Sequence, residues 1–179
     1  MIFYVAQGVG LIGMILSFIS FQKNEKRKIL WIQASSAFTW AVHFILLGIF
    51  IDAGAFTGAG MNLVEIPRNL IFAQKHKKRR QRILTAVFIT AFVISGVLTW
   101  ESIFSLFPII AMSISTVVFS LQNPRYIRFF MMPVSIFWLV YNIISFSFAG
   151  VLTESFCLCS ILIAIFRFDI LKMENKKPE

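Results

Sequence analysis

The fold of this chain is decided by a basic octet, Lys75-His76-Lys77-Lys78-Arg79-Arg80-Gln81-Arg82, and by the apolar sequence on either side of it. A transmembrane helix needs about 20 mostly apolar residues. Such stretches lie directly before and after the octet, and five more fill most of the remaining chain. The seven stretches are residues 2–21, 29–48, 54–74, 83–99, 103–121, 129–148 and 151–168. The sequence therefore predicts an all-α membrane protein with seven transmembrane helices.

The composition excludes most other classes of protein. Of the 179 residues, 58% are apolar and only 14% are charged, whereas soluble domains are roughly 45–50% apolar and about 25% charged. Disordered chains are poor in apolar and aromatic residues, so disorder is excluded as well. The length indicates a single transmembrane domain over residues 1–179.

The charged residues favour one orientation of the seven helices. Cytoplasmic connections of membrane proteins carry an excess of Lys and Arg. All 17 basic residues fall in the first, third and fifth connections, near the inner end of the third helix, or from Arg167 onward. The second, fourth and sixth connections hold Asp52, Glu101 and Glu154 instead. The sequence therefore predicts an N-terminus outside, a C-terminus inside and a cytoplasmic tail over residues 169–179.

The octet from Lys75 to Arg82 has two readings, because a basic run can also bind nucleic acid. Here it connects two membrane helices, on the side where the orientation rule places positive charge. We therefore expect it to set the topology and to contact anionic lipid. The lipid bilayer is an expected partner, and nucleic acid is not.

Two segments of the chain, residues 1–74 and 103–168, share three markers that predict an internal repeat. The paired markers lie 100, 98 and 99 residues apart: Gln22 and Gln122, Trp40 and Trp138, Arg68 and Arg167. One helix, residues 83–99, separates the two segments, so both have the same orientation. The predicted fold is two parallel three-helix bundles joined by a linker helix, a 3+1+3 arrangement.

Polar side chains form stripes on three of the predicted helices. Their spacing of three or four residues puts each stripe on one helix face. The stripes are Gln33, Ser36, Trp40 and His43 in the second helix, Asn62, Glu65 and Asn69 in the third, and Trp138, Tyr141, Asn142 and Ser145 in the sixth. Polar groups inside a membrane usually face a cavity or the bundle interior. If the three faces converge, they form a polar pocket with aromatic walls.

The pocket predicts a set of substrate-binding residues: Trp40, His43, Asn62, Trp138, Tyr141 and Asn142. Each has a structural alternative, because Asn can hydrogen-bond a neighbouring helix and Trp can pack the bundle or lie at the membrane interface. Glu65 and His43 are also candidates for proton coupling, since histidine titrates near neutral pH. The alternative for Glu65 is an ion pair with Arg68 three residues later.

The layout and three segments carry a resemblance to known families. The segments are Phe18-Ile19-Ser20-Phe21-Gln22-Lys23-Asn24, Trp40-Ala41-Val42-His43-Phe44 and Ile66-Pro67-Arg68-Asn69. Over nearly its full length the chain resembles the bacterial inner-membrane YgjV-type family. The 3+1+3 layout is similar to the SWEET/PQ-loop transporter superfamily, although the proline expected before Gln22 and Gln122 is absent.

The resemblance implies a location in the bacterial inner membrane and transport of sugars, vitamins, amino acids or similar solutes by alternating access. SWEET-like transporters use a Trp and an Asn from each half around the substrate. Trp40, Asn62 and Trp138 match that pattern, while the Asn expected on the last helix is missing and Asn142 is the substitute.

No enzymatic or metal chemistry is predicted. The motif Gly8-Val9-Gly10-Leu11-Ile12-Gly13 matches a dinucleotide-binding pattern, but that pattern requires a preceding strand. Cys157 and Cys159 have no further metal ligands nearby, and no cofactor is expected. We expect a transporter or facilitator of a small solute that is not an enzyme. The alternative is a non-transporting membrane protein that binds lipid or a partner protein, and a homo-oligomer stays open.

Overall fold

The computed structural model describes residues 1–21, 25–51, 55–74, 76–120 and 124–171, and it is entirely helical over these ranges. Gln22, Asp52, Lys75, Gln122 and the tail from residue 172 lie outside the described residues. The helices are α1 (Ile2–Phe21), α2 (Lys26–Ile51), α3 (Phe56–Phe72), α4 (Lys78–Leu98), α5 (Leu106–Val118), α6 (Pro124–Ile144) and α7 (Phe148–Ala164). A short 3-10 helix, η1 (Ile103–Ser105), precedes α5, and the π-helix η2 (Ile165–Ile170) extends α7. The predicted all-α fold with seven helices is confirmed.

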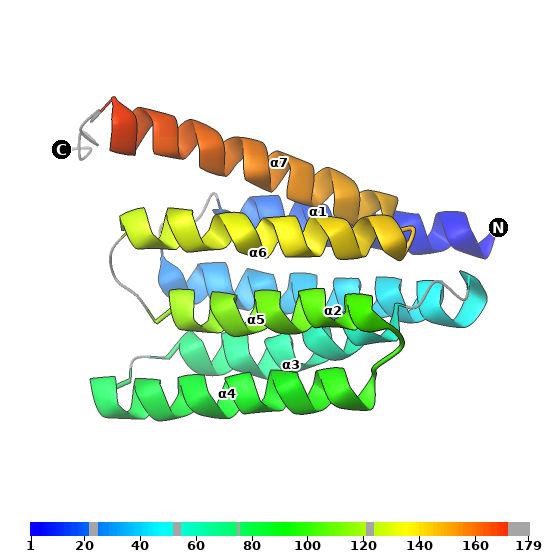
Figure 1. Cartoon of the computed structure of the whole chain (residues 1–179), viewed down its shortest axis with the longest axis horizontal. Helices are drawn as coiled ribbons and strands as arrows, with labels where there is room; N and C mark the ends of the chain where they lie inside the picture. Colours follow the sequence, from blue (N-terminus) through cyan, green and yellow to red (C-terminus); the bar gives the residue numbers. More distant parts are fainter. Residues whose placement is uncertain (22–24, 52–54, 75, 121–123, 172–179) are drawn as a thin grey trace.

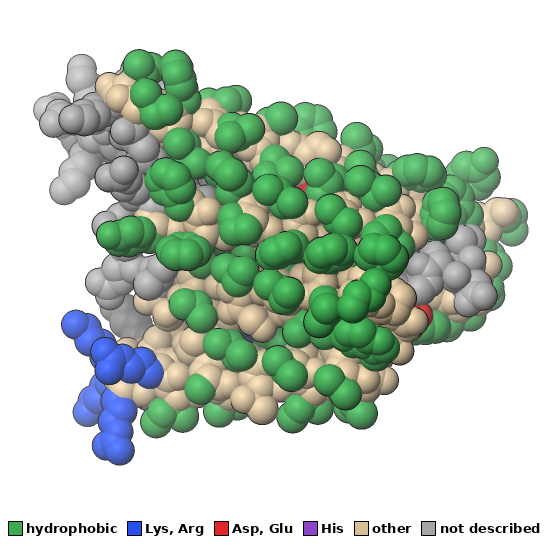
Figure 2. Space-filling model, viewed as in Figure 1, with side chains coloured by type: hydrophobic (Ala, Val, Ile, Leu, Met, Phe, Trp, Pro, Cys, Tyr) green, Lys and Arg blue, Asp and Glu red, His purple; other side chains and the backbone are tan. Residues whose placement is uncertain are grey.

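Several of these helices can cross a membrane. By length and composition, three described segments suffice alone: Ile2–Ser20, Arg27–Phe50 and Lys78–Leu98. Segments of α5, α6 and α7 are also apolar but shorter. Figure 2 shows large apolar side chains over most of the visible surface. Soluble monomers rarely expose so much contiguous apolar surface, which indicates that this surface faces lipid.

The helices form a closed ring of six, with the seventh outside it. Each ring helix packs on its two neighbours in the order α1, α2, α3, α5, α6, α7 and back to α1. The remaining helix, α4, packs on α3 and α5. Figure 1 shows the chain reversing direction at every connection, with the two termini at opposite ends of the molecule.

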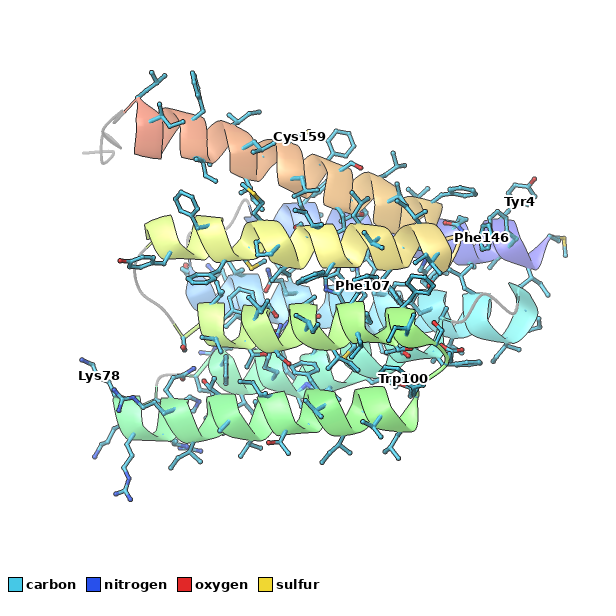
Figure 3. The ribbon with its side chains drawn as sticks, in the orientation of Figure 1. Tyr4, Lys78, Trp100, Phe107, Phe146 and Cys159 are labelled. Atoms are coloured by element: carbon cyan, nitrogen blue, oxygen red, sulfur yellow. The ribbon has the colours of Figure 1, made fainter. Side chains whose placement is uncertain are left out.

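The alternating direction gathers the basic sequence at one end. We call the end where α2, α4 and α6 begin the basic end, and the other the far end. Figure 2 shows Lys and Arg side chains gathered at the basic end, and Figure 3 places Lys78 there and Tyr4, Trp100 and Phe146 at the far end. The expectation that residues 75–82 form a connecting loop is wrong for residues 78–82, because α4 begins at Lys78. Lys and Arg are good helix formers, and their long side chains reach the interface from a helical turn.

The break between the last two helices differs from the sequence expectation. The sequence suggested a break at Ala149-Gly150, whereas α6 ends at Ile144 and α7 begins at Phe148. The Ser147 hydroxyl caps α7 by accepting a hydrogen bond from the Gly150 N–H at 3.2 Å. Gly150 is buried, and a Cβ atom there would collide with the side chain of Asn142. Glycine is therefore needed here for close packing. Because α7 starts earlier, Glu154 lies inside the helix and not in the sixth connection.

We expect Gly150→Ala to lower the free energy of unfolding by about 1–3 kcal/mol, because the added methyl group overpacks the contact with Asn142. Thermal or denaturant unfolding of purified protein in detergent measures the loss. The matched control is Gly8→Ala in α1, where a Cβ atom meets nothing within 4 Å. Equal stability of the two variants would contradict the packing role of Gly150.

Candidate functional site

A cavity of about 170 Å³ lies at the centre of the six-helix ring. Its lining residues come from all six ring helices, and among the described residues none comes from α4. A single water molecule needs only about 10–15 Å³ on the same measure, so the cavity has room for a small solute. Enclosure by helices from both halves of the chain makes it the candidate functional site.

The cavity brings together most of the predicted polar stripes. Trp40 of α2, Asn62 and Glu65 of α3, and Trp138 and Asn142 of α6 all line it. Asn62 donates a hydrogen bond from Nδ2 to the Gly58 carbonyl at 2.8 Å, which fixes its side chain on its own helix. Gln33 and Ser36 extend the lining of α2 toward the basic end. Binding of a substrate by these residues stays a prediction.

Aromatic rings of α2 and α6 line the cavity. The Phe44 ring stacks on Trp138 with ring centroids 6.0 Å apart, and it lies 6.1 Å from the ring of Trp40. Phe44 is further along α2 from the basic end than Trp40 or Gln33. Trp40, Phe44 and Trp138 therefore form an aromatic part of the cavity wall.

Two predicted substrate-binding residues, His43 and Tyr141, do not line the cavity. His43 is fully buried, and its Nδ1 and Nε2 atoms lie 2.7 Å from the Ala6 carbonyl and from the Ser147 hydroxyl. A carbonyl can only accept, so Nδ1–H donates to Ala6 and Nε2 accepts from Ser147. The Tyr141 hydroxyl accepts a hydrogen bond from the Gly58 N–H at 2.7 Å. Both side chains thus join helices beyond the end of the cavity.

Further hydrogen bonds close the far end of the bundle. Gln7 of α1 donates from Nε2 to the Phe146 carbonyl at 2.8 Å and accepts from the Ala149 N–H at 3.1 Å. The hydroxyls of Thr57 on α3 and Ser105 are hydrogen-bonded at 2.8 Å, which joins α3 to the start of α5. Together with His43 and Tyr141, these bonds link the first three helices to the last three. We call this set of contacts the far-end seal.

The lining continues toward the basic end. Phe119 at the end of α5 and Met131 near the start of α6 belong to the cavity wall. Figure 1 shows α7 diverging from α6 as it approaches the C-terminus. The interior is thus tied together at the far end, and its cavity extends toward the basic end.

Glu65 and Arg68 form an ion pair on the cavity wall, with Arg68 Nη2 2.8 Å from Glu65 Oε1. The Arg68 side chain is 1% exposed, and it also donates to Asn69, Ser115 and Thr116 at 3.1–3.2 Å. All five N–H groups of the guanidinium therefore have a partner. The Arg68 guanidinium also lies over the rings of Phe92 and Phe119, at 5.5 and 5.1 Å. The predicted ion pair is confirmed, whereas proton coupling at Glu65 stays a prediction.

Glu154 is the functional candidate that the sequence analysis missed. It lies on α7 beside Thr153 and Cys157, and all three line the cavity. Ser135 of α6 lines the same cavity. Within the described part of the chain, no Lys or Arg forms an ion pair with Glu154. The signal was present in the sequence, because Gly150, Thr153, Glu154 and Cys157 follow the i, i+3, i+4, i+7 spacing of one helix face.

Comparisons with known proteins give one family. The model of the Imp-YgjV family, described as bacterial inner membrane protein, matches residues 4–172. No curated protein and no solved structure matches the chain significantly. The matched region runs from α1 past η2 and includes every residue of the cavity wall.

Proposed function

Because the chain belongs to the Imp-YgjV family of bacterial inner membrane proteins, we propose that it carries a small solute across that membrane by alternating access. The observation that carries the proposal is the central cavity, since both halves of the chain contribute to its wall. Transporter sites are typically found near the middle of the membrane at the interface of repeats. A sugar, vitamin or amino acid is the expected kind of cargo.

The helix contacts support the proposed 3+1+3 arrangement. A two-fold axis that relates α1 to α5, α2 to α6 and α3 to α7 exchanges the α3–α5 contact with the α7–α1 contact. Both contacts are present, and so are the matching pairs within each triplet. The place of α4 outside the ring fits a linker helix that restores the direction of the chain.

The far-end seal supports a particular conformational state. In our proposal the basic end faces the cytoplasm, the N-terminus lies outside and the C-terminus inside. The cavity extends toward the basic end while Gln7, His43 and Tyr141 tie the far end together. The structure then corresponds to an inward-facing state, and transport requires the far-end seal to open.

The orientation predicts the behaviour of reporter fusions in bacterial cells. Green fluorescent protein at the C-terminus is expected to fluoresce, and alkaline phosphatase at the same position to be inactive, because the C-terminus stays in the cytoplasm. Fluorescence and phosphatase activity are measured on matched expression levels. An active phosphatase fusion with a dark fluorescent fusion would reverse the proposed orientation.

Transport is tested with purified protein in liposomes, using glucose, riboflavin, alanine and lysine as probes. For a probe that enters, Trp40→Ala and Asn62→Ala are expected to lower uptake about tenfold, equivalent to ~1.4 kcal/mol of lost contact with the cargo. The matched control is Phe38→Ala, since Phe38 is on the same helix but 60% exposed to lipid. The proposal fails if no probe enters faster than into empty liposomes, or if the cavity variants transport like the control.

A second candidate function is lipid binding without transport. It is favoured by a hollow of about 1400 Å³ at the basic end, whose wall includes Arg27, Lys78 and Arg82. Clustered Lys and Arg at a membrane surface attract anionic lipid. If the protein binds lipid without transport, replacing residues 77–80 by neutral residues is expected to remove the anionic lipid that co-purifies. Trp40→Ala is expected to leave the amount of bound lipid unchanged.

A further inference from the structure

We propose that the central cavity binds a small organic cation, an amine or a quaternary ammonium group, with Glu154 as its counter-charge. The inference rests on the proposed function in one respect: the bound cation would be the cargo. The cavity as a cation site is argued from its charge, its hydrogen-bonding groups and its aromatic walls.

The charge of the cavity wall is unbalanced. Three described lining residues carry charge: Glu65, Arg68 and Glu154. The first two neutralise each other in an ion pair of 2.8 Å. No Lys or Arg in the described part of the chain forms an ion pair with Glu154. A lone carboxylate inside a membrane is costly unless a cation joins it. The wall therefore attracts positive charge and repels an anionic solute.

Several hydrogen-bond donors of the wall are used within the protein. Ser36 donates to the Gly13 carbonyl, and Thr153 to the Ala149 carbonyl, each at 2.8 Å. The N–H groups of Arg68 are all engaged as described above. An anion or carbonyl ligand would need free donors, and these hydroxyl and guanidinium groups do not provide them.

Acceptors, by contrast, are left over. Gln33 Oε1 and Asn142 Oδ1 are buried and have no hydrogen-bond partner among the described residues, and both residues line the cavity. Asn142 is 3% exposed, so bulk water does not compensate for the missing bond. Buried acceptors without a donor are unfavourable, and an ammonium group supplies donors only. The amide side chains of Gln33 on α2 and Asn142 on α6 thus belong to the same cavity wall as Glu154 of α7.

Aromatic rings complete the environment. Trp40, Phe44 and Trp138 all line the cavity, and Phe44 stacks between the two helices against Trp138. Ring faces attract ammonium groups, and quaternary ammonium groups are commonly bound by such aromatic walls. The volume of about 170 Å³ suits a small molecule and excludes a folded peptide.

The chain contains its own reporter for this charge. Cys157 lies on the cavity wall, one helical turn from Glu154, and the other of the two cysteines, Cys159, is exposed on α7. In a Cys159→Ser variant only Cys157 can react. We would compare its rates with 2-(trimethylammonio)ethyl methanethiosulfonate, a cation, and with 2-sulfonatoethyl methanethiosulfonate, an anion. Each rate is divided by the rate at which the same reagent reacts with glutathione in solution, which corrects for the intrinsic reactivity of the two reagents.

The cationic reagent is expected to react with Cys157 at least tenfold faster than the anionic one, and Glu154→Gln is expected to reduce this preference at least tenfold. The matched control is Glu25→Gln, because Glu25 is an exposed carboxylate paired with Lys28 at the basic end. In the Cys159→Ser protein without a second substitution, tetramethylammonium chloride is expected to slow the labelling of Cys157 by the cationic reagent. The comparison is with sodium chloride at the same ionic strength. This measurement needs no change at Glu154, so it stands even if that variant does not fold.

Three outcomes would overturn the proposal: a preference that survives Glu154→Gln, a preference for the anionic reagent, or a Cys157 that reacts only after unfolding. The liposome assay separates this inference from the proposed function. Uptake of glucose with no cation preference at Cys157 overturns the cation site alone. A cation preference without uptake of any probe overturns transport and leaves the site in place.

Discussion

Arg68→Met is expected to lower the free energy of unfolding by about 3 kcal/mol. The Arg68 side chain is 1% exposed and holds Glu65, Asn69, Ser115 and Thr116 through its guanidinium. Met fills part of the volume but leaves the Glu65 carboxylate without its cation. Removing one partner of a buried pair costs far more than the pair contributes. Denaturant unfolding in mixed micelles measures the loss.

A double variant tests this explanation. In Arg68→Met/Glu65→Gln the unpaired carboxylate is gone, so at least half of the lost stability is expected to return. The amide oxygen introduced by Glu65→Gln can still accept from Asn69, as the carboxylate does at 3.1 Å. A double variant as unstable as Arg68→Met would mean that the loss comes from packing or from the hydroxyl contacts, and not from the charge.

His43→Ala is expected to lower the free energy of unfolding by about 2 kcal/mol, because side-chain volume is lost and the Ser147 O–H is left without its acceptor. His43 is fully buried and joins the Ala6 carbonyl to Ser147, each at 2.7 Å. The contact links α1 and α2 to the turn before α7, so its loss also weakens the far-end seal. Thermal unfolding in detergent measures the change.

The chain offers a matched control in its other histidine. His76 lies near the basic end, where its Nε2 atom hydrogen-bonds with the Ile71 carbonyl at 2.8 Å. Its side chain is only half-buried. His76→Ala is therefore expected to cost less than about 0.5 kcal/mol. If both alanine variants lose the same stability, the far-end contacts of His43 contribute nothing beyond an ordinary surface hydrogen bond.

The sequence predicted the positions of the helices well, but it did not predict where along the helices the cavity ends. Apolar stretches of about 20 residues located all seven helices, because lipid allows few alternatives to a helix. The stripe spacing correctly placed Trp40, Asn62, Trp138 and Asn142 on inward faces. His43 continues the same stripe but lies where Gly10 of α1 and Ala149 of α7 close in. Spacing gives the direction of a side chain around its helix, and only neighbouring helices determine where along that helix a cavity ends.

Glu154 was missed for a related reason. Its place inside α7 depends on where that helix begins, and this is set by the contact between Gly150 and Asn142 together with the Ser147 cap. The Gly150–Asn142 contact cannot be read from local sequence. Glycine often marks the end of a helix, and here the tertiary contact of the glycine overrides that tendency.

The position of α4 has a mechanical consequence. The two halves of the ring meet along two seams, one between α3 and α5 and one between α7 and α1. The α3–α5 seam is reinforced, because α4 packs on both of its helices. In addition, Arg68 of α3 donates hydrogen bonds to Ser115 and Thr116 of α5. Among the described helices none is found to pack across the α7–α1 seam in this way, and toward the basic end the rings of Phe18 and Phe156 meet across it. In the alternating access that we propose, the α3–α5 seam is therefore expected to stay closed and act as the hinge. The α7–α1 seam is expected to be the contact that separates.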